Sequence, residues 1–269
     1  MSQSAAPRYS AEWLALQPHW QQVIQNLPPD DVDFLAYDWH FWRREKQTPP
    51  PGDWTYWLIL AGRGFGKTRV GAEWVRESVQ SEQFVNIAGA TADDARDIMV
   101  EGESGILAIC PEDERPIYRK SERKLSWPNG ATSLIFTADE PERFRGKQHS
   151  GFWADEIGAW RYPDAFTQMK FGLRLGARPR AVITTTPRPT ALVKELVDDP
   201  NCVVTRGSSY ENRPNLAPAF SEAIVRQYEG TRLGRQELNA ELLLDTEGAL
   251  WWRDLIQYVT LRGAADETD

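Results

Sequence analysis

Short apolar runs of strand length alternate with helical patterns through the middle of the chain. The predicted strands are 56–60, 84–88, 151–154, 181–185 and 202–205. Helical patterns lie between them and cover 67–79, 91–107, 163–175 and 191–197. Alternation of strands and helices is typical of a parallel sheet whose two faces are both covered by helices. The pattern therefore predicts an α/β domain.

One pair of apolar runs departs from this alternation. Residues 125–127 and 131–137 flank Asn129-Gly130, the dipeptide that gives the strongest signal for a two-residue hairpin turn. We therefore expect a β-hairpin within the otherwise parallel sheet.

The two ends of the chain carry helical patterns without intervening strands. Residues 11–27 and 32–46 show apolar positions near a period of 3.6, and a proline-rich linker follows at 48–52. Near the other end, 217–228 and 232–244 are predicted as two helices. The expected apolar inner face of these two helices consists of Phe220, Ile224, Leu233, Leu238 and Leu242.

These patterns divide the chain into four parts. We expect an N-terminal helical segment (1–50), an α/β core (51–210), a small helical lid (211–250) and a final stretch (251–269) too short to complete another unit. The lid follows the last strand, and its links to the core are rich in Asn, Pro and Gly, which suits hinges.

Composition and charge limit the function classes. The chain has 41% hydrophobic and 26% charged residues, as soluble globular proteins do, and no apolar run long enough for a membrane span. The first residues lack the basic start and apolar stretch of a secretory signal. Since 31 basic and 39 acidic residues give a net charge of −8, binding of nucleic acid would require a local basic patch or a partner. Two distant cysteines form neither a zinc pattern nor a disulfide framework, so a reducing compartment is the default.

The sharpest chemical signal is a glycine-rich loop between the first predicted strand and the first core helix. It reads Gly62-Arg63-Gly64-Phe65-Gly66-Lys67-Thr68. Glycines let main-chain N–H groups surround phosphate oxygens, and the helix N-terminus adds its positive end. Lys67 would reach the β- and γ-phosphates, and the Thr68 hydroxyl would hold Mg²⁺. Ala61 stands where the strict pattern has glycine.

The strand at 151–154 ends in two acids, Asp155 and Glu156. Placed about 90 residues after the phosphate loop, such a pair suits the metal side of a phosphate site. Asp155 would bind Mg²⁺ through water and Thr68, and Glu156 would polarise the attacking water. The adjacent glutamate favours hydrolysis over simple phosphate binding.

Two further segments could complete the site. The strand at 181–185 runs into Thr184-Thr185-Thr186-Pro187-Arg188, whose hydroxyls would point into the ligand crevice of an α/β sheet and sense the γ-phosphate, although threonine is also an ordinary strand residue. The loop 140–147 carries Arg143 and Arg145, which could neutralise transition-state charge in cis or from a neighbouring subunit, or simply form a solvated charged loop.

Together these motifs resemble the ATPase domain of the large terminase subunit, the motor that packs DNA into the heads of tailed phages. The resemblance covers residues 40–252. It includes the phosphate loop with 71–74 behind it, Arg145-Gly146, Asp155-Glu156, 184–188, 230–238 and 247–251. Members of this family commonly show the Ala61 departure. They also place an adenine-contacting glutamine upstream of the loop, where this chain has Gln47.

The resemblance implies a P-loop NTPase of the additional-strand, catalytic-glutamate type, with ATP and Mg²⁺ as cofactors. It implies Glu156, Lys67 and Arg145 as catalytic residues, Arg145 acting in trans, and Thr68 and Asp155 as the metal-binding residues. The implied nucleotide-binding residues are Gln47, Gly62, Arg63, Gly64, Phe65, Gly66, Lys67, Thr68, Arg69, Thr186 and Arg188.

The resemblance also implies a biological setting. The expected activity is ATP hydrolysis driving double-stranded viral DNA into a procapsid, in the cytoplasm of the infected bacterial host and without a membrane. The implied partners are DNA, the portal protein, the small terminase subunit and further copies in a ring, a pentamer in this family, with a monomer as the alternative for the isolated chain. We expect 251–269 to begin a linker to a nuclease domain that this sequence does not include, so nuclease activity is not expected here.

Other functions stay open at this point. A related P-loop helicase would need a second motor-like domain, for which 269 residues leave no room. A nucleotide-gated assembly switch would not need the water-polarising Glu156. A cluster of five basic residues could track DNA phosphates or form a charged hairpin edge that resists aggregation. Its members are Arg115, Arg119, Lys120, Arg123 and Lys124.

Overall fold

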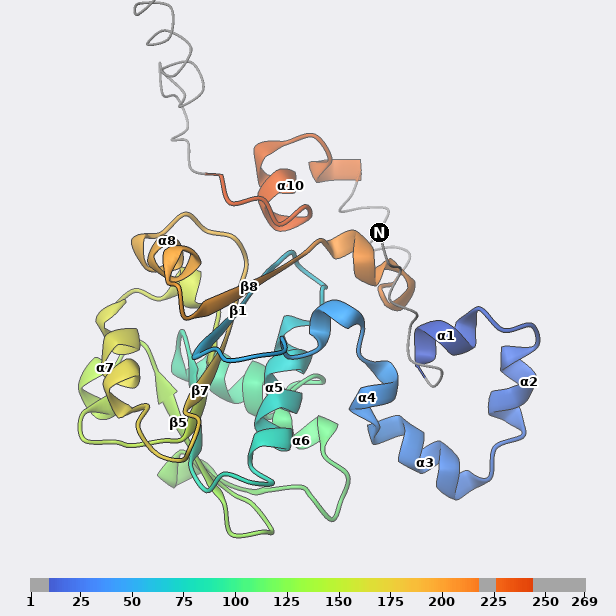
Figure 1. The fold of residues 1–269 in the computed structure, drawn as a ribbon, viewed down its shortest axis with the longest axis horizontal. Helices are drawn as coiled ribbons and strands as arrows, with labels where there is room; N and C mark the ends of the chain where they lie inside the picture. Colours follow the sequence, from blue (N-terminus) through green and yellow to red (C-terminus); the bar gives the residue numbers. More distant parts are fainter. Residues whose placement is uncertain (1–9, 218–225, 244–269) are drawn as a thin grey trace, which may run out of the picture.

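The protein is built around a sheet of eight strands in the order β3-β4-β5-β2-β6-β7-β1-β8 (Figure 1). The computed structural model describes residues 10–217 and 226–243. The strands are β1 (Tyr56–Ala61), β2 (Val85–Gly89), β3 (Ile117–Arg119), β4 (Lys124–Ser126), β5 (Thr132–Thr137), β6 (Gly151–Asp155), β7 (Arg180–Thr185) and β8 (Cys202–Gly207). From β5 to β8 all neighbours are parallel, whereas β3, β4 and β5 pair antiparallel. The predicted α/β class and the hairpin at Asn129-Gly130 are confirmed.

The position of β7 defines the type of sheet. β7 pairs with β1 on one side and with β6 on the other, so it separates the strand before the glycine loop from the strand that ends in the acid pair. This inserted strand is the feature expected of an additional-strand P-loop fold. The expected fold class is therefore confirmed.

Helices cover both faces of the sheet, as the alternation predicts. On one face, α5 (Lys67–Ser78), the π-helix η2 (Asp94–Val100) and α6 (Ile106–Ile109) pack on inward side chains such as Trp57 and Ile59. On the other, α7 (Asp164–Gly172) and α8 (Ala191–Asp198) pack on Leu58 and Leu60. Because successive strand residues face opposite sides, each buried strand contributes to two cores.

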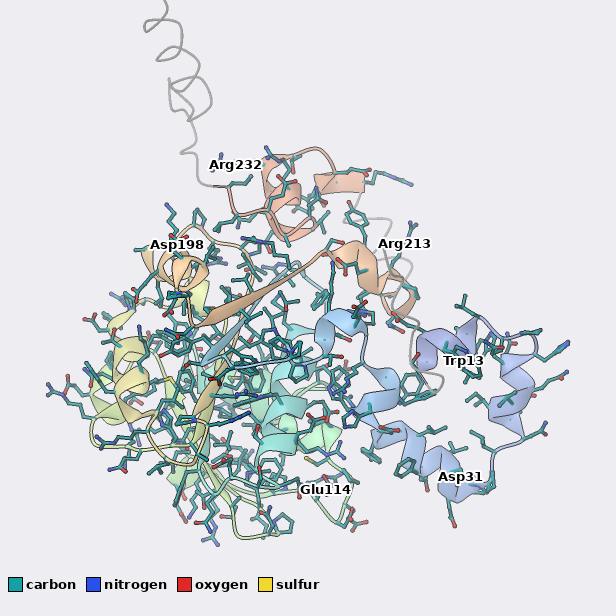
Figure 2. All side chains as sticks on the ribbon, viewed as in Figure 1. Trp13, Asp31, Glu114, Asp198, Arg213 and Arg232 are labelled. Carbon is teal, nitrogen blue, oxygen red and sulfur yellow. The ribbon has the colours of Figure 1, made fainter. Side chains whose placement is uncertain are left out.

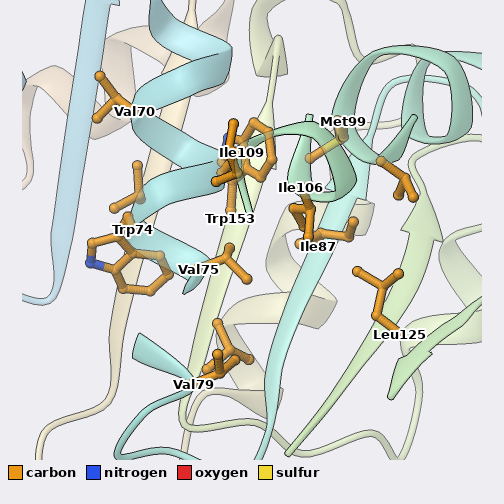
Figure 3. Packing of buried hydrophobic residues seen from close by; sticks show 14 of the residues in the cluster. Val70, Trp74, Val75, Val79, Ile87, Met99, Ile106, Ile109, Leu125 and Trp153 are labelled. Carbon is orange, nitrogen blue, oxygen red and sulfur yellow. The ribbon is translucent and has the colours of Figure 1, made fainter. Parts of the chain in front are cut away.

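Helix α5 lies very close to β6. Figure 3 shows Val70, Trp74 and Val75 of this helix beside Trp153 of the strand. A Cβ atom on Gly71 would lie 2.1 Å from the Trp153 ring, so only glycine fits at this point of the helix. The approach holds the helix that begins at the phosphate loop against the strand that ends at the acids.

Two of the predicted long helices are interrupted. The prediction of one helix over 11–27 is wrong, because α1 (Ala11–Ala15) and α2 (Trp20–Gln25) are separated at Pro18 and at His19, whose φ is +67°. Proline lacks the N–H that a helix interior needs. The helix predicted over 91–107 is likewise divided into η2 and α6, with Gly102 and Gly105 between them.

The prediction of one helix over 32–46 is also wrong. This stretch forms α3 (Pro29–Tyr37), α4 (Trp39–Trp42) and the 3₁₀-helix η1 (Glu45–Gln47). Asp38 is extended at the break, and its side chain accepts a hydrogen bond from the N–H of Phe41. No residue of α1, α2 or α3 is buried, and these helices form an arm beside the core that carries Trp13 and Asp31 (Figures 1 and 2).

The C-terminal segment contains less helix than predicted. The 3₁₀-helix η6 (Ser209–Asn215) and α10 (Arg232–Glu237) are present, but the helix predicted over 232–244 ends at Glu237. Leu238 is buried and Leu242 packs against the core, whereas Leu233 is 48% exposed and does not belong to an inner face. Phe220, Ile224 and most of the helix predicted over 217–228 lie outside the described residues, as does everything after 243. Among the described helices, none has the length and apolar character needed to cross a bilayer.

Candidate active site

A cleft of about 660 Å³ lies at the carboxyl ends of β1, β6 and β7. This edge of a parallel sheet is where ligands of α/β folds bind. The predicted site residues that line the cleft are Arg63, Gly64, Lys67, Asp155, Glu156, Thr186 and Arg188. The fold therefore brings together residues from three segments that are far apart in the sequence. The other predicted residues of the loop and helix start adjoin this lining without being part of it: Gly62, Phe65, Gly66 and Thr68.

The glycine loop turns sharply from β1 into α5. Gly64 and Gly66 have φ values of +72° and +95°, a region that side chains with a Cβ rarely adopt. Gly66 is the N-cap of α5, so the unpaired N–H groups of that helix begin at the loop. Such a helix start favours an anion, which agrees with the predicted phosphate-binding role.

Lys67 lies between the loop and the acid pair. Its Nζ donates to the carbonyl oxygens of Ala61 and Gly62, both at 3.1 Å, and lies 3.6 Å from Oε1 of Glu156. The side chain is 8% exposed. The ammonium group thus sits at the base of the cleft, opposite the carboxylate predicted to activate water.

Glu156 adopts a left-handed backbone conformation directly after β6, with φ of +48°. This conformation is uncommon for a residue other than glycine and is often found at functional sites. Its Oε2 accepts hydrogen bonds from both the N–H and the hydroxyl of Thr186, each at 3.2 Å. The carboxylate is therefore held in one orientation at the wall of the cleft.

Asp155 is buried beside Glu156 in a chain of hydrogen bonds. Nε1 of Trp153 donates to Oγ1 of Thr184 at 2.8 Å, and that hydroxyl donates to Oδ1 of Asp155 at 2.5 Å. Burial, and then the neighbouring Glu156 charge, raise the pKa of Asp155 to about 7, against the lowering effects of Thr184 and Lys67. A buried carboxylate of raised pKa gains from a nearby cation.

The donor set fits a magnesium ion. The carboxylate of Asp155 and the hydroxyl of Thr68, the second residue of α5, are hard oxygen ligands. Mg²⁺ commonly uses one or two protein oxygens and keeps its other positions for water and phosphate.

Three predicted site residues have their side chains engaged away from this cleft. Gln47 is buried under the loop, where its Nε2 donates to the carbonyl of Phe65 at 3.1 Å. Arg69 turns away along α5, forms an ion pair with Glu73 at 2.7 Å and lies over the Trp39 ring. These roles of Gln47 and Arg69 stay predictions.

Arg145 is the third of these residues. Its side chain is 67% exposed and forms an ion pair with Glu142 at 2.9 Å. A residue that completes the site of a neighbouring copy need not line the cleft of its own chain, so its proposed role in trans stays a prediction.

The structure adds residues that sequence reasoning missed. The end of α10 covers the loop, since Nε of Arg63 donates to Glu237 at 2.8 Å and the N–H of Arg63 donates to the Glu237 carbonyl at 2.8 Å. Arg44 and Asn212 donate to loop carbonyls from the other side. These contacts join segments about 20 to 170 residues apart, so no local pattern could show them.

The basic cluster predicted as a candidate DNA contact is partly neutralised within the chain. Arg119, Lys120 and Arg123 form ion pairs with Glu122, Glu101 and Glu140, respectively. Arg115 donates to the carbonyl of Cys110. The two interpretations of this cluster both stay open.

The glycine loop, the Lys67–Glu156 pair, the buried Asp155 and the inserted strand β7 together define a P-loop NTPase of the additional-strand type. Within that class, the family is shown by sequence. Residues 58–258 match the model of the N-terminal part of the T4-like-virus-type terminase large subunit. The chain belongs to this family.

Solved structures show the same fold. The large terminase ATPase domain of Thermus phage P74-26 matches with a TM-score of 0.56 at 17% identity, over 81% of this chain and 100% of that one. The full-length large terminase of another phage, a thermophilic bacteriophage, was solved in complex with ADP. It matches with a TM-score of 0.60 at 16% identity, over 78% of this chain and 52% of that one, so this chain spans about half its length. A comparison with curated protein sequences gives no match.

Proposed function

We propose that this chain binds ATP with Mg²⁺ in the cleft and hydrolyses it. The observation that carries the proposal is the distance of 3.6 Å between Lys67 Nζ and Glu156 Oε1, at the junction of a glycine loop and a buried aspartate. The large terminase of the thermophilic bacteriophage was solved with ADP and with ATP-γ-S, which supports a nucleotide as the ligand.

Each residue has a defined task in this proposal. Lys67 leaves its carbonyl partners to neutralise the β- and γ-phosphate oxygens. Thr68 and Asp155 hold Mg²⁺, which supplies charge neutralisation to the phosphate oxygens when bound. Glu156 accepts the proton of the attacking water at the oxygen that Thr186 does not occupy.

The other predicted contacts complete the nucleotide site. The N–H groups of the loop from Gly62 to Gly66 bind phosphate oxygens, and Arg63 and Arg188, which line the cleft, add positive charge. Gln47 contributes a base contact with the amide valences that its loop contacts leave free. Arg69 supports the phosphate site from the first turn of α5, and Arg145 enters the site of a neighbouring copy.

We further propose that hydrolysis drives double-stranded DNA into a procapsid. Membership of the terminase large-subunit family supports this step. The proposed partners are DNA, the portal protein, the small terminase subunit and further copies of this chain in a ring, in the cytoplasm of an infected bacterium.

The direct test measures nucleotide binding and phosphate release separately. We expect Lys67→Ala to weaken binding and abolish turnover, and Glu156→Gln to bind normally and lose turnover. Glu195→Gln is a matched control, because this glutamate is 63% exposed and pairs with Lys170 outside the cleft. Wild-type turnover by Glu156→Gln would contradict the assignment, and a protein that binds ATP without any turnover would instead be a nucleotide-gated switch.

The motor step needs a second measurement. We expect linear duplex DNA to raise the ATPase rate, and the increase to shrink as salt is raised, because phosphate contacts weaken with ionic strength. An unchanged rate with DNA at both low and high salt would leave the ATPase without the proposed coupling.

A further inference from the structure

The outer side of the phosphate loop is bound by donors from two distant segments. Nδ2 of Asn212, in η6, donates to the carbonyl oxygen of Gly64 at 2.6 Å. Nη2 of Arg44, just before η1, donates to the carbonyl oxygen of Phe65 at 2.6 Å, and Gln47 shares that oxygen. Two consecutive loop carbonyls are therefore fixed by side chains.

Fixing these carbonyls also fixes the direction of the loop N–H groups. A trans peptide is planar, with its C=O and N–H pointing in opposite directions. When Asn212 holds the Gly64 carbonyl, the N–H of Phe65 points the other way. When Arg44 holds the Phe65 carbonyl, the N–H of Gly66 does the same. Since Gly64 and Gly66 have positive φ values and a broad range of backbone conformations, the loop needs such external contacts to keep one conformation.

The two donors also bind one another. Nη1 of Arg44 donates to Oδ1 of Asn212, and the guanidinium lies 5.0 Å from the centre of the Phe65 ring. Beside this contact, Lys46 and Glu211 form an ion pair at 3.0 Å. The N-terminal segment and the segment after β8 thus meet at the back of the phosphate loop.

We propose that Arg44 and Asn212 are positioning residues that orient the phosphate-binding N–H groups of the loop toward the cleft. The proposal rests on the proposed nucleotide function, and it specifies which part of the ligand is affected. Because the contacts act on the loop main chain, they strengthen binding of the diphosphate group whatever the base. They also make phosphate affinity depend on the segment at 209–215, which continues toward α10.

The test measures the dissociation constants of ADP and GDP by calorimetry for folded variants. We expect Asn212→Ala and Arg44→Ala each to weaken both nucleotides about tenfold and by the same factor. The double variant should be little weaker than either single one, because the two residues act through one network. Arg43→Ala and Arg213→Ala are controls, since Arg43 pairs with Glu77 and Arg213 is exposed.

Two conservative changes separate positioning from general stability. Asn212→Asp keeps the acceptor for Arg44 and loses the donor to Gly64, so we expect it to bind nucleotide as weakly as Asn212→Ala while unfolding at the wild-type temperature. Arg44→Lys keeps the charge but cannot serve both acceptors, so an intermediate loss is expected. Wild-type affinity in both Asn212 variants would overturn the proposal. Failure of the wild-type protein to bind any nucleotide would instead overturn the proposed function.

Discussion

Thr186 and Glu156 are joined by two hydrogen bonds to a single oxygen. The N–H and the hydroxyl of Thr186 both donate to Oε2 of Glu156 at 3.2 Å, while Oε1 faces Lys67. The carboxylate therefore cannot rotate without losing both bonds. Since Thr186 follows β7 and Glu156 follows β6, the contact links the ends of two neighbouring strands.

This relationship predicts a defect in turnover without a defect in binding. Thr186→Val keeps the shape of the side chain and the main-chain bond but removes the hydroxyl donor. We expect kcat to fall about tenfold or more with KM nearly unchanged, since a hydrogen bond to a charged group contributes about 1.5–3 kcal/mol. Steady-state phosphate release measures both constants. Thr186→Ser, which retains the hydroxyl, should stay near wild type, and equal loss in both variants would contradict this role.

Gln47 is predicted to act on both the loop and the base. Gln47→Ala should weaken GTP binding through the lost contact with the Phe65 carbonyl, and weaken ATP binding further through the lost base contact. Competition between the two nucleotides measures the ratio. An equal loss for ATP and GTP would leave only the contact with the loop, and no loss for either would exclude both roles.

Arg145 is expected to complete the site of a neighbouring copy. Isolated chains should then hydrolyse ATP slowly, and activity per chain should rise with protein concentration. Mixing Arg145→Ala with Glu156→Gln should restore partial activity, because some interfaces then carry both intact residues. Arg143→Ala, which alters the same exposed loop, replaces Arg145→Ala in the control mixture. An absence of recovery in a mixture shown to assemble would point to an arginine acting within its own chain.

Gly71 should be irreplaceable in the fold. Gly71→Ala places a methyl group where the Trp153 ring lies, so we expect the free energy of unfolding to fall by about 2 kcal/mol or more. Trp153→Phe in the same chain should recover part of this loss by making room. Urea denaturation of the four members of this cycle measures the coupling. Ser78→Ala, near the end of α5, is the control. If the two substitutions are additive, the close approach does not limit the packing.

His149 should make stability depend on pH. Burial lowers the pKa of His149 to about 4 from 6.5, and its ring nitrogens contact Asn86 and the Met169 carbonyl. Between these values the unfolded chain binds more protons than the folded one, so stability falls as pH falls from 6.5 toward 4. The contribution is about 3 kcal/mol at most.

Denaturant titrations across that range measure the slope. His149→Gln should remove this part of the pH dependence, even if the variant is less stable at every pH. His40→Gln should not, because the His40 side chain is 67% exposed. A His149→Gln slope identical to that of wild type would assign the pH dependence to other groups.

Local patterns predicted the catalytic strands well because the relevant residues are close in sequence. The apolar run 56–60, the glycines and Lys67 lie within one continuous segment, as do 151–154 and the acid pair. The interrupted helices show the opposite case. Apolar positions on both sides of Pro18 kept a helical period, although proline cannot continue the hydrogen bonding.

Arg69 shows how a local signal was overlooked. Its place after Thr68 suggested a phosphate contact, yet its spacing of four residues from Glu73 predicts pairing along the helix. The contacts of Arg44 and Asn212 with the loop carry no such signal. They depend on the packing of η1 and η6 against β1 and β8, which becomes visible only in the folded chain.

The placement of β7 between β1 and β6 has a consequence for mutational tolerance. Val182 faces one core and Ile183 the other, while Thr184 and Thr185 end the strand beside the acids. Every position from Ala181 to Thr185 is thus occupied on a core face or at the site, and each is less than 9% exposed. A saturation mutagenesis profile should therefore show its narrowest range of accepted residues along this strand, with volume limiting the first three positions and hydrogen bonding the last two.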